Sequence, residues 1–179
     1  MKNILIIFVL SFISCKAQQQ ILPLETRGIP IEGAYYKDLD NELDPYIGTW
    51  KGTFENKTFT ITFTKYKNLG GLSNFYKDRL AGKYTMIDSN GNVLYSTYNL
   101  ANEDAKVSSL GFVENTNHTK LRFQFSDLCI DGEIHISFNN IQKTQIYWKY
   151  FTYQELVTDD SGCAPYNEMP RGEFVLTKQ

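Results

Sequence analysis

Apolar and polar side chains alternate along most of this chain, and a period of two residues indicates half-buried β-strands. Residues 57–64 are the clearest case, with three apolar side chains on one face and four threonines on the other. The same alternation predicts further strands over residues 49–54, 82–88, 93–99, 106–113, 119–125, 133–138, 145–153 and 173–177. Turn-forming pairs such as Asn90-Gly91 separate these strands. The pattern is typical of a barrel or a two-sheet sandwich, and we predict an all-β fold, a single antiparallel up-and-down β-barrel of eight to nine strands.

Composition supports a β-rich fold and excludes some partners. The chain has 12 Tyr, 12 Phe and 2 Trp, and aromatic residues favour pleated, half-buried surfaces. Its 18 basic and 20 acidic side chains give a net charge of −2, without a basic run that could follow a phosphate backbone. We therefore expect no nucleic-acid partner, and we expect a monomer.

The N-terminus has the layout of a secretory signal. A positively charged start precedes an apolar run over residues 4–10, and a small residue, Ser14, stands before Cys15. This run is far shorter than the ~20 apolar residues that a helix needs to cross a bilayer. Ile13-Ser14-Cys15 resembles the lipobox of bacterial lipoproteins. The resemblance implies that the chain is acylated at Cys15, for instance with palmitate, and anchored in the cell envelope. We expect the protein on the outer membrane, facing the periplasm.

Three segments organise the chain: residues 1–14 as a lipoprotein signal peptide, 15–45 as an N-terminal tether and docking segment, and 46–179 as the β-barrel domain. The acidic run at 38–44 allows a calcium site or a capped, solvated helical turn. It lacks the glycine and the closing acid of a calcium loop, which favours the capped turn. We predict no metal and no cofactor.

Two cysteines remain once Cys15 is acylated. In an oxidising compartment we expect Cys129 and Cys163 to form a disulfide, with two unrelated thiols as the alternative. If all strands alternate in direction, the links that contain these cysteines lie at the same end of the barrel.

Long links should mark the binding end of the barrel. The strand order places residues 66–80 and 154–172 at one end, and binding sites usually gather on loops carried by a rigid scaffold. Phe75 and Tyr76 lie in the first of these links. We expect a ligand to enter there, with aromatic side chains that merely cover the barrel end as the alternative.

The segment Tyr46-Ile47-Gly48-Thr49-Trp50-Lys51-Gly52 resembles the opening of the first strand in lipocalins and fatty-acid-binding proteins. In that superfamily the tryptophan closes one end of a small barrel, and a basic side chain often packs over it. The lid loop of lipocalins joins the first two strands, whereas here that link is only Asn56-Lys57.

A second resemblance covers most of the chain. The segments 35–41, 46–50, 57–61, 78–84 and 175–179 resemble an uncharacterised family of flavobacterial lipoproteins, a domain of unknown function.

Motifs for catalysis are absent from the sequence. His118 lies in a predicted turn and His135 on a polar strand face, and neither has metal-ligand spacing. No Gly-x-Ser-x-Gly segment exists, and Gly70-Gly71 lacks the ending of a phosphate loop. We therefore predict a protein that is not an enzyme.

The aromatic side chains on inward faces are the remaining guide to function. An eight-stranded barrel holds its own side chains or one small ligand, so a filled core and an apolar cavity both fit. The candidate ligand-binding residues are Trp50, Phe59, Phe63, Phe75, Tyr76 and Trp148. Our first hypothesis is an envelope-anchored lipoprotein with a lipocalin-like barrel that binds an apolar small molecule or envelope component. The alternative is a protein-interaction or inhibitor module with a filled barrel, and a hydrolase with dispersed catalytic residues is a third hypothesis.

Overall fold

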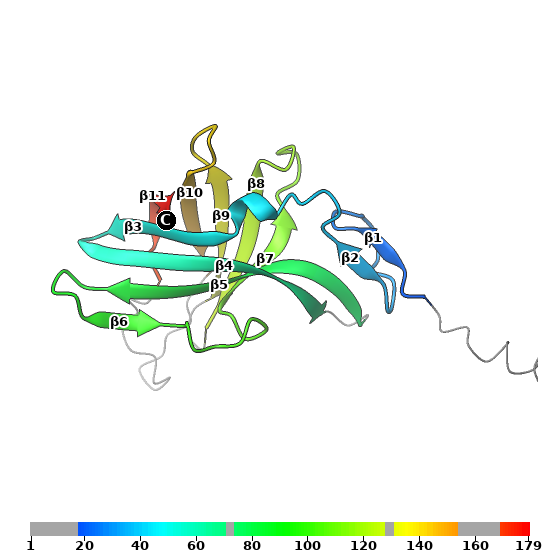
Figure 1. Cartoon of the computed structure of the whole chain (residues 1–179), viewed down its shortest axis with the longest axis horizontal. Helices are drawn as coiled ribbons and strands as arrows, with labels where there is room; N and C mark the ends of the chain where they lie inside the picture. Colours follow the sequence, from blue (N-terminus) through cyan, green and yellow to red (C-terminus); the bar gives the residue numbers. More distant parts are fainter. Residues whose placement is uncertain (1–17, 71–73, 128–130, 154–168) are drawn as a thin grey trace, which may run out of the picture.

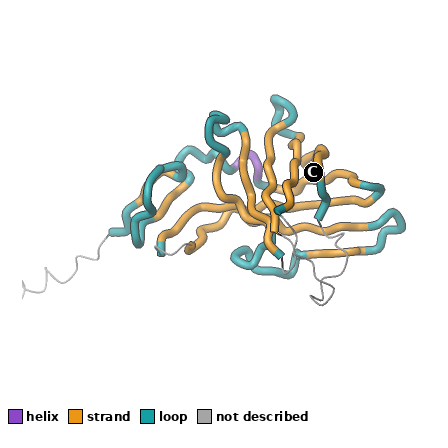
Figure 2. The backbone as a smooth tube through the Cα atoms, turned by 180° about the vertical axis from the view of Figure 1, so that it is seen from behind, coloured by secondary structure: helices purple, strands orange, loops and turns teal. Residues whose placement is uncertain are grey.

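The computed structural model describes residues 18–70, 74–127, 131–153 and 169–179, and strands make up most of them (Figure 1, Figure 2). This part of the chain also contains one 3-10 helix, η1 (Asp44–Tyr46). The strands are β1 (Ile21–Pro23), β2 (Tyr35–Lys37), β3 (Gly48–Phe54), β4 (Lys57–Gly70), β5 (Phe75–Ile87), β6 (Val93–Ser96), β7 (Val107–Phe112), β8 (Lys120–Ser126), β9 (Asp131–Phe138), β10 (Gln145–Thr152) and β11 (Gly172–Lys178). Cys15, Cys129 and Cys163 lie outside the described residues, so acylation and the disulfide stay predictions. Within the described ranges, no helix has the length and apolar character needed to cross a membrane.

Eight strands close into an antiparallel barrel, which confirms the predicted fold class. Their hydrogen-bonded order is β3-β4-β5-β7-β8-β9-β10-β11, and β11 pairs with β3. Closure between β5 and β7 includes the pairing of Gly82 with Val107. A Cβ atom on Gly82 would lie 3.0 Å from the Cβ atom of Val107, so the glycine lets the two strands approach.

Strand β6 departs from the predicted order. Among the described strands it pairs only with β5, and it lies beside the barrel. Val93 is 61% exposed and Leu94 is 47% exposed, because no core lies beneath them. Without β6 in the path, every later strand runs opposite to the predicted direction. The β4–β5 and β10–β11 links therefore lie at opposite ends of the barrel, and the prediction that they share one end is wrong.

The predicted loop over residues 66–80 is also wrong, because most of it is strand. β4 and β5 pair without interruption from Thr58 opposite Ile87 to Gly70 opposite Phe75. The two strands thus project beyond the barrel (Figure 1). Residues 66–70 and 75–77 of these strands are half-buried or exposed on both faces, so the alternation that identifies a strand with one buried face is lost there.

Two short N-terminal strands widen this projection into a small sheet. We call it the arm: β1, β2 and residues 66–70 and 75–79. β1 pairs in parallel with β2, and β2 pairs in parallel with β5. Asp78 is buried in the arm, where it accepts hydrogen bonds from the Tyr35 hydroxyl at 2.5 Å and the Asp38 backbone N–H at 2.9 Å. Burial and the hydrogen bond to Asp78 raise the pKa of Tyr35.

The acidic run at 38–44 forms a turn that Asp38 caps. Its carboxylate accepts the backbone N–H groups of Glu42 and Leu43 at 2.9 and 3.1 Å, and the Lys65 ammonium at 3.1 Å. The turn leads into the 3-10 helix η1. The prediction of a capped turn is therefore correct, whereas the prediction that the turn is solvated is wrong for the Asp38 carboxylate, which is buried. No group of three His, Cys, Asp or Glu in the described ranges is arranged to hold a metal ion.

Aromatic side chains from opposite walls meet inside the barrel. Phe63 on β4 stacks on Phe123 of β8 with 4.9 Å between ring centroids. Phe59 on β4 meets Trp148 of β10 at 5.4 Å. Since β4 lies three strands away from both β8 and β10 in the barrel order, these contacts span the interior.

Trp50 is buried near the start of the first barrel strand, as predicted. Its Nε1–H donates to the Tyr46 carbonyl oxygen at 2.8 Å. The Lys178 ammonium lies 5.2 Å from the indole ring centroid. A basic side chain over this tryptophan is the arrangement that the lipocalin resemblance implies.

Candidate functional site

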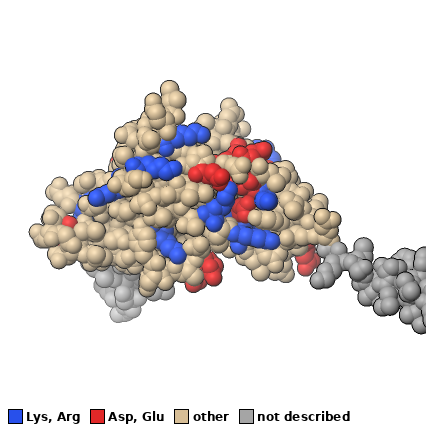
Figure 3. Space-filling model, in the orientation of Figure 1, with Lys and Arg blue, Asp and Glu red and all other residues tan. Residues whose placement is uncertain are grey.

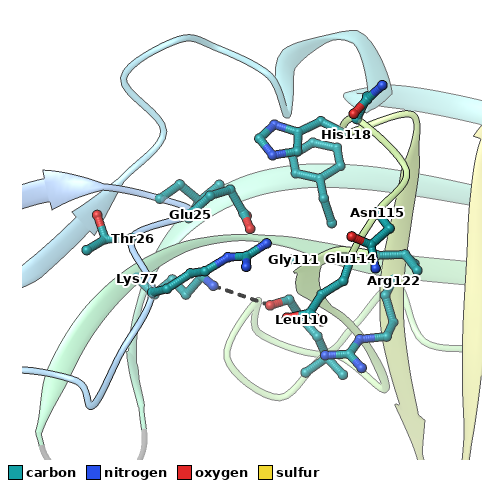
Figure 4. A pocket seen from close by; sticks show the side chains of 14 residues that line it. Glu25, Thr26, Lys77, Leu110, Gly111, Glu114, Asn115, His118 and Arg122 are labelled. Carbon is teal, nitrogen blue, oxygen red and sulfur yellow. Dashed lines mark hydrogen bonds between the residues drawn. The ribbon is translucent and has the colours of Figure 1, made fainter.

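A groove of about 370 Å³ lies between the arm and the barrel. One wall comes from residues 24–27, which follow β1, and from Lys77 of the arm. The other comes from residues 110–115, Asn117, His118 and Arg122, on β7, β8 and the link between them. Figure 4 shows Glu25 and Lys77 approaching from the first wall toward Leu110 and Gly111 of the second. We call this hollow the groove.

A β-bulge in β7 shapes the wall opposite Lys77. The register between β7 and β8 shifts between Ser109 and Gly111, and Gly111 has a positive φ of 133°. The bulge leaves the Leu110 carbonyl oxygen 3.3 Å from the Lys77 ammonium, which donates to it. A Cβ atom at Gly111 would lie 3.4 Å from Glu25 Oε1 and 3.6 Å from Lys77 Nζ. These are ordinary contact distances, so the positive φ, and not a lack of space, favours glycine at this position.

Several charged side chains meet in the groove, and Lys77 and Glu25 among them are half-buried. Burial lowers the pKa of Lys77 below its ordinary value of 10.5. Glu25 raises the pKa of Lys77, whereas Arg79 and Arg122 lower it. Glu25 Oε1 is buried and accepts no hydrogen bond from the described residues. The groove thus offers a desolvated ammonium beside a carboxylate oxygen that lacks a hydrogen-bond donor.

We predict that the pKa of Lys77 in the folded protein lies below 10.5, because burial penalises the charged form. The native state then binds fewer protons than the unfolded chain between the lowered pKa and 10.5. The contribution of Lys77 should therefore make the free energy of unfolding rise with pH across that window. Heteronuclear NMR of the side-chain Cε and Nζ nuclei measures the pKa directly, and a titration at or above 10.5 contradicts the prediction.

His118 lies at the rim of the groove, on the turn where the sequence predicts it. Its Nδ1 is 2.6 Å from Glu42 Oε1, and its ring stacks on Phe112 with 4.9 Å between centroids. His118 also lines two neighbouring hollows, which extend the groove toward residues 138–143 at the same end of the barrel. This histidine links the segment around Glu42 to the barrel.

The other histidine belongs to a different surface. His135 Nε2 lies 2.5 Å from Glu133 Oε1 on the same strand, and its ring contacts Phe151. The two histidines therefore contact different acidic residues, Glu42 and Glu133.

The predicted ligand-binding residues fall into two separate groups. Trp50, Phe59, Phe63 and Trp148 are fully buried in the barrel. Phe75 and Tyr76 belong to the arm, where Phe75 packs edge-on against Tyr36 at 5.5 Å. These two do not join the interior residues, because β4 and β5 carry them away from the barrel.

Sequence reasoning missed the groove. Glu25, Lys77 and Arg122 are far apart in the sequence, and no spacing joins them. One signal was available: Gly111 interrupts a predicted strand, and an isolated glycine in a strand pattern often marks a bulge.

The fold and the groove together define an eight-stranded β-barrel protein with a polar groove beside the barrel. The chain matches DUF6705, described as a family of unknown function, over residues 1–179, and it belongs to that family. No curated protein and no solved structure matches the chain significantly.

Proposed function

We propose that the protein is an interaction module of the cell envelope, without enzymatic activity, in which the barrel is a filled scaffold and the groove binds a peptide-like ligand. The close approach of both Lys77 and Glu25 to Gly111 carries the proposal. A peptide-like ligand that presents a carboxylate beside an N–H group would complement both the Lys77 ammonium and the Glu25 carboxylate.

The charges of the groove favour such a ligand. An incoming carboxylate would accept hydrogen bonds from Lys77 and would offset the repulsion of Lys77 by Arg79 and Arg122. An N–H group of the same ligand would supply the donor that Glu25 Oε1 lacks among the described residues. Half-burial of Lys77 strengthens both interactions, because charge-assisted hydrogen bonds gain strength away from water.

The packed interior supports the groove over the barrel as the binding place. Rings that meet across the barrel, such as Phe63 with Phe123, occupy the space that a lipocalin-type ligand would need. This favours the interaction-module hypothesis over our first hypothesis of an apolar ligand inside the barrel.

Photo-crosslinking in the envelope of the producing cell tests the groove. A benzophenone amino acid replaces Asn115, which is exposed and lines the groove, or Asn90, which is exposed on the β5–β6 turn. We expect a peptide or protein adduct from position 115 and none from position 90. Lys77→Gln should reduce the adduct roughly tenfold, since a hydrogen bond to a charged group contributes ~1.5–3 kcal/mol.

Lys83→Gln is the matched control, because Lys83 lies on the same strand and does not line the groove. It should leave the adduct unchanged. Equal adducts from positions 115 and 90, or an adduct insensitive to Lys77→Gln, contradict the proposed groove function.

A second candidate function is binding of a small molecule inside the barrel. One observation favours it: Trp148 Nε1 is buried there and has no acceptor among the described residues. A ligand with a hydrogen-bond acceptor would satisfy this indole. Mass spectrometry of molecules retained by the purified protein tests this alternative, and loss of a retained molecule on Trp148→Phe would support it.

The envelope position is proposed from the lipobox resemblance. In this proposal acyl groups on Cys15 hold a monomer on the outer membrane, facing the periplasm. Two or more acyl chains anchor a protein firmly, whereas one chain is marginal. Cys15→Ser should therefore yield an unprocessed or soluble product in membrane fractionation. A Cys15→Ser variant that stays with membranes through a high-salt wash would exclude acylation as the anchor.

A further inference from the structure

The arm has two faces of different character. Directly paired residues of neighbouring strands share a face of a sheet. The pairings Asn68–Lys77, Lys77–Tyr36 and Tyr36–Leu22 therefore place these four residues on one face, and Lys77 lines the groove from it.

The other face carries an uncharged row of large side chains. Leu69 pairs with Tyr76, Tyr76 with Tyr35, and Tyr35 with Ile21. Leu69 is 57% exposed and Ile21 is 54% exposed. The row therefore presents two tyrosines between two exposed aliphatic side chains.

A lysine side chain packs over the two tyrosine rings of this row. The Lys67 ammonium lies 4.2 Å from the ring centroids of both Tyr35 and Tyr76. It also donates to Gln19 Oε1 at 3.0 Å. Tyrosine and lysine side chains each have an apolar body and a polar end. Such side chains are typical of surfaces at a membrane–water boundary.

The loop between β1 and β2 meets the outer end of the arm, which we call the tip, and it carries exposed apolar side chains. Ile29 is 90% exposed, and Ile31 beside it is 46% exposed. The loop that carries them is fixed to the arm, because the Gly33 N–H donates to the Asn74 carbonyl oxygen and Gln19 Nε2 donates to the Gly33 carbonyl oxygen. The described chain begins next to this tip, at Gln18.

The short connection to Cys15 limits how far the arm can be from a membrane. Three residues separate the Cα atoms of Cys15 and Gln18 by no more than ~11 Å. The headgroup region on one side of a bilayer is only ~5–7 Å thick. A chain acylated at Cys15 therefore brings the arm tip to the lipid headgroups, and the hydrogen bonds of Gln19 leave no long linker between them.

We infer that the arm is a lipid-contact surface: Ile29 and Ile31 at its tip and the row from Ile21 to Leu69 rest in the headgroup region of the membrane. This inference rests on the proposed acylation of Cys15. It leaves Lys77 on the opposite face of the arm, so the groove stays open to the aqueous side. Figure 3 shows that acidic and basic side chains of the face in view gather where the arm joins the barrel, and that an acidic group also lies at the end of the arm away from the barrel.

Tryptophan quenching by brominated lipids tests this orientation. Trp50 and Trp148 are fully buried in the barrel and give a constant background. The acylated full-length protein is reconstituted in phosphatidylethanolamine–phosphatidylglycerol vesicles with bromines near the headgroup end of the acyl chains. Ile29→Trp and Leu69→Trp each add one reporter on the arm. Val93→Trp adds a matched reporter on β6, at the far end of the molecule in Figure 1.

Interfacial side chains insert ~5–10 Å into the headgroup and acyl boundary, so roughly half of the added fluorescence from Ile29→Trp should be quenched. Leu69→Trp should be quenched as well, and Val93→Trp should match the background. Vesicle flotation separates the two proposals. Protein that does not float refutes the acyl anchor and this inference with it. Protein that floats while Ile29→Trp stays unquenched, or is quenched no more than Val93→Trp, refutes the lipid contact and leaves the anchor standing.

Discussion

Replacing Trp50 with alanine is expected to lower the free energy of unfolding by ~3–5 kcal/mol, as for other large aromatic side chains in cores. Trp50 is fully buried, and its removal would leave a cavity next to Phe138 and Tyr46. The Tyr46 carbonyl oxygen would also lose the indole donor that lies 2.8 Å away. Urea unfolding followed by circular dichroism measures the change.

Two variants make the interpretation of Trp50→Ala specific. Trp50→Phe keeps a ring in the core and loses the hydrogen bond, so it should cost less, about 1–2 kcal/mol. Ile141→Ala changes a side chain that is 95% exposed and should stay within ~0.5 kcal/mol of the parent protein. A loss below about 1 kcal/mol for Trp50→Ala would mean that this tryptophan does not help to fill the core.

The barrel was predictable from the sequence because its strands have one buried face. In residues 57–63, for instance, Phe59, Ile61 and Phe63 are all buried, and the alternation records this directly. The role of β6 was not predictable. Residues 93–99 also alternate, but the choice between joining the barrel and lying beside it depends on whether β5 pairs with β7, which only the folded chain decides.

The arm and the groove lay beyond sequence reasoning for a related reason. Lys67 and Tyr76 belong to strands that leave the core, and without a buried face their polar and aromatic residues look like a loop. The groove depends on the position of Glu25 against Lys77, and that position follows from parallel pairing of two three-residue strands, β1 and β2. Such short strands carry too little pattern to be detected.

Replacing Asp38 with alanine is expected to destabilise the protein by ~2–4 kcal/mol, because it removes a buried carboxylate that accepts three charge-assisted hydrogen bonds. The backbone N–H groups of Glu42 and Leu43 would lose their acceptor, and Lys65 would keep only Asp44 as a partner in the acidic run. The turn holds the chain between β2 and β3, so its opening should also loosen the arm. Hydrogen exchange of residues 35–43 should therefore rise more than exchange in the barrel strands.

Asp40 supplies the control, since it lies in the same acidic run but is exposed. Asp40→Ala should change the free energy of unfolding by less than ~0.5 kcal/mol. The pair of variants also separates the two interpretations of the run. A calcium site would need several of these carboxylates together and would make stability depend on calcium. A capping carboxylate needs only Asp38. Equal losses for the two variants, or a loss for Asp38→Ala that appears only with calcium present, would contradict the capping role.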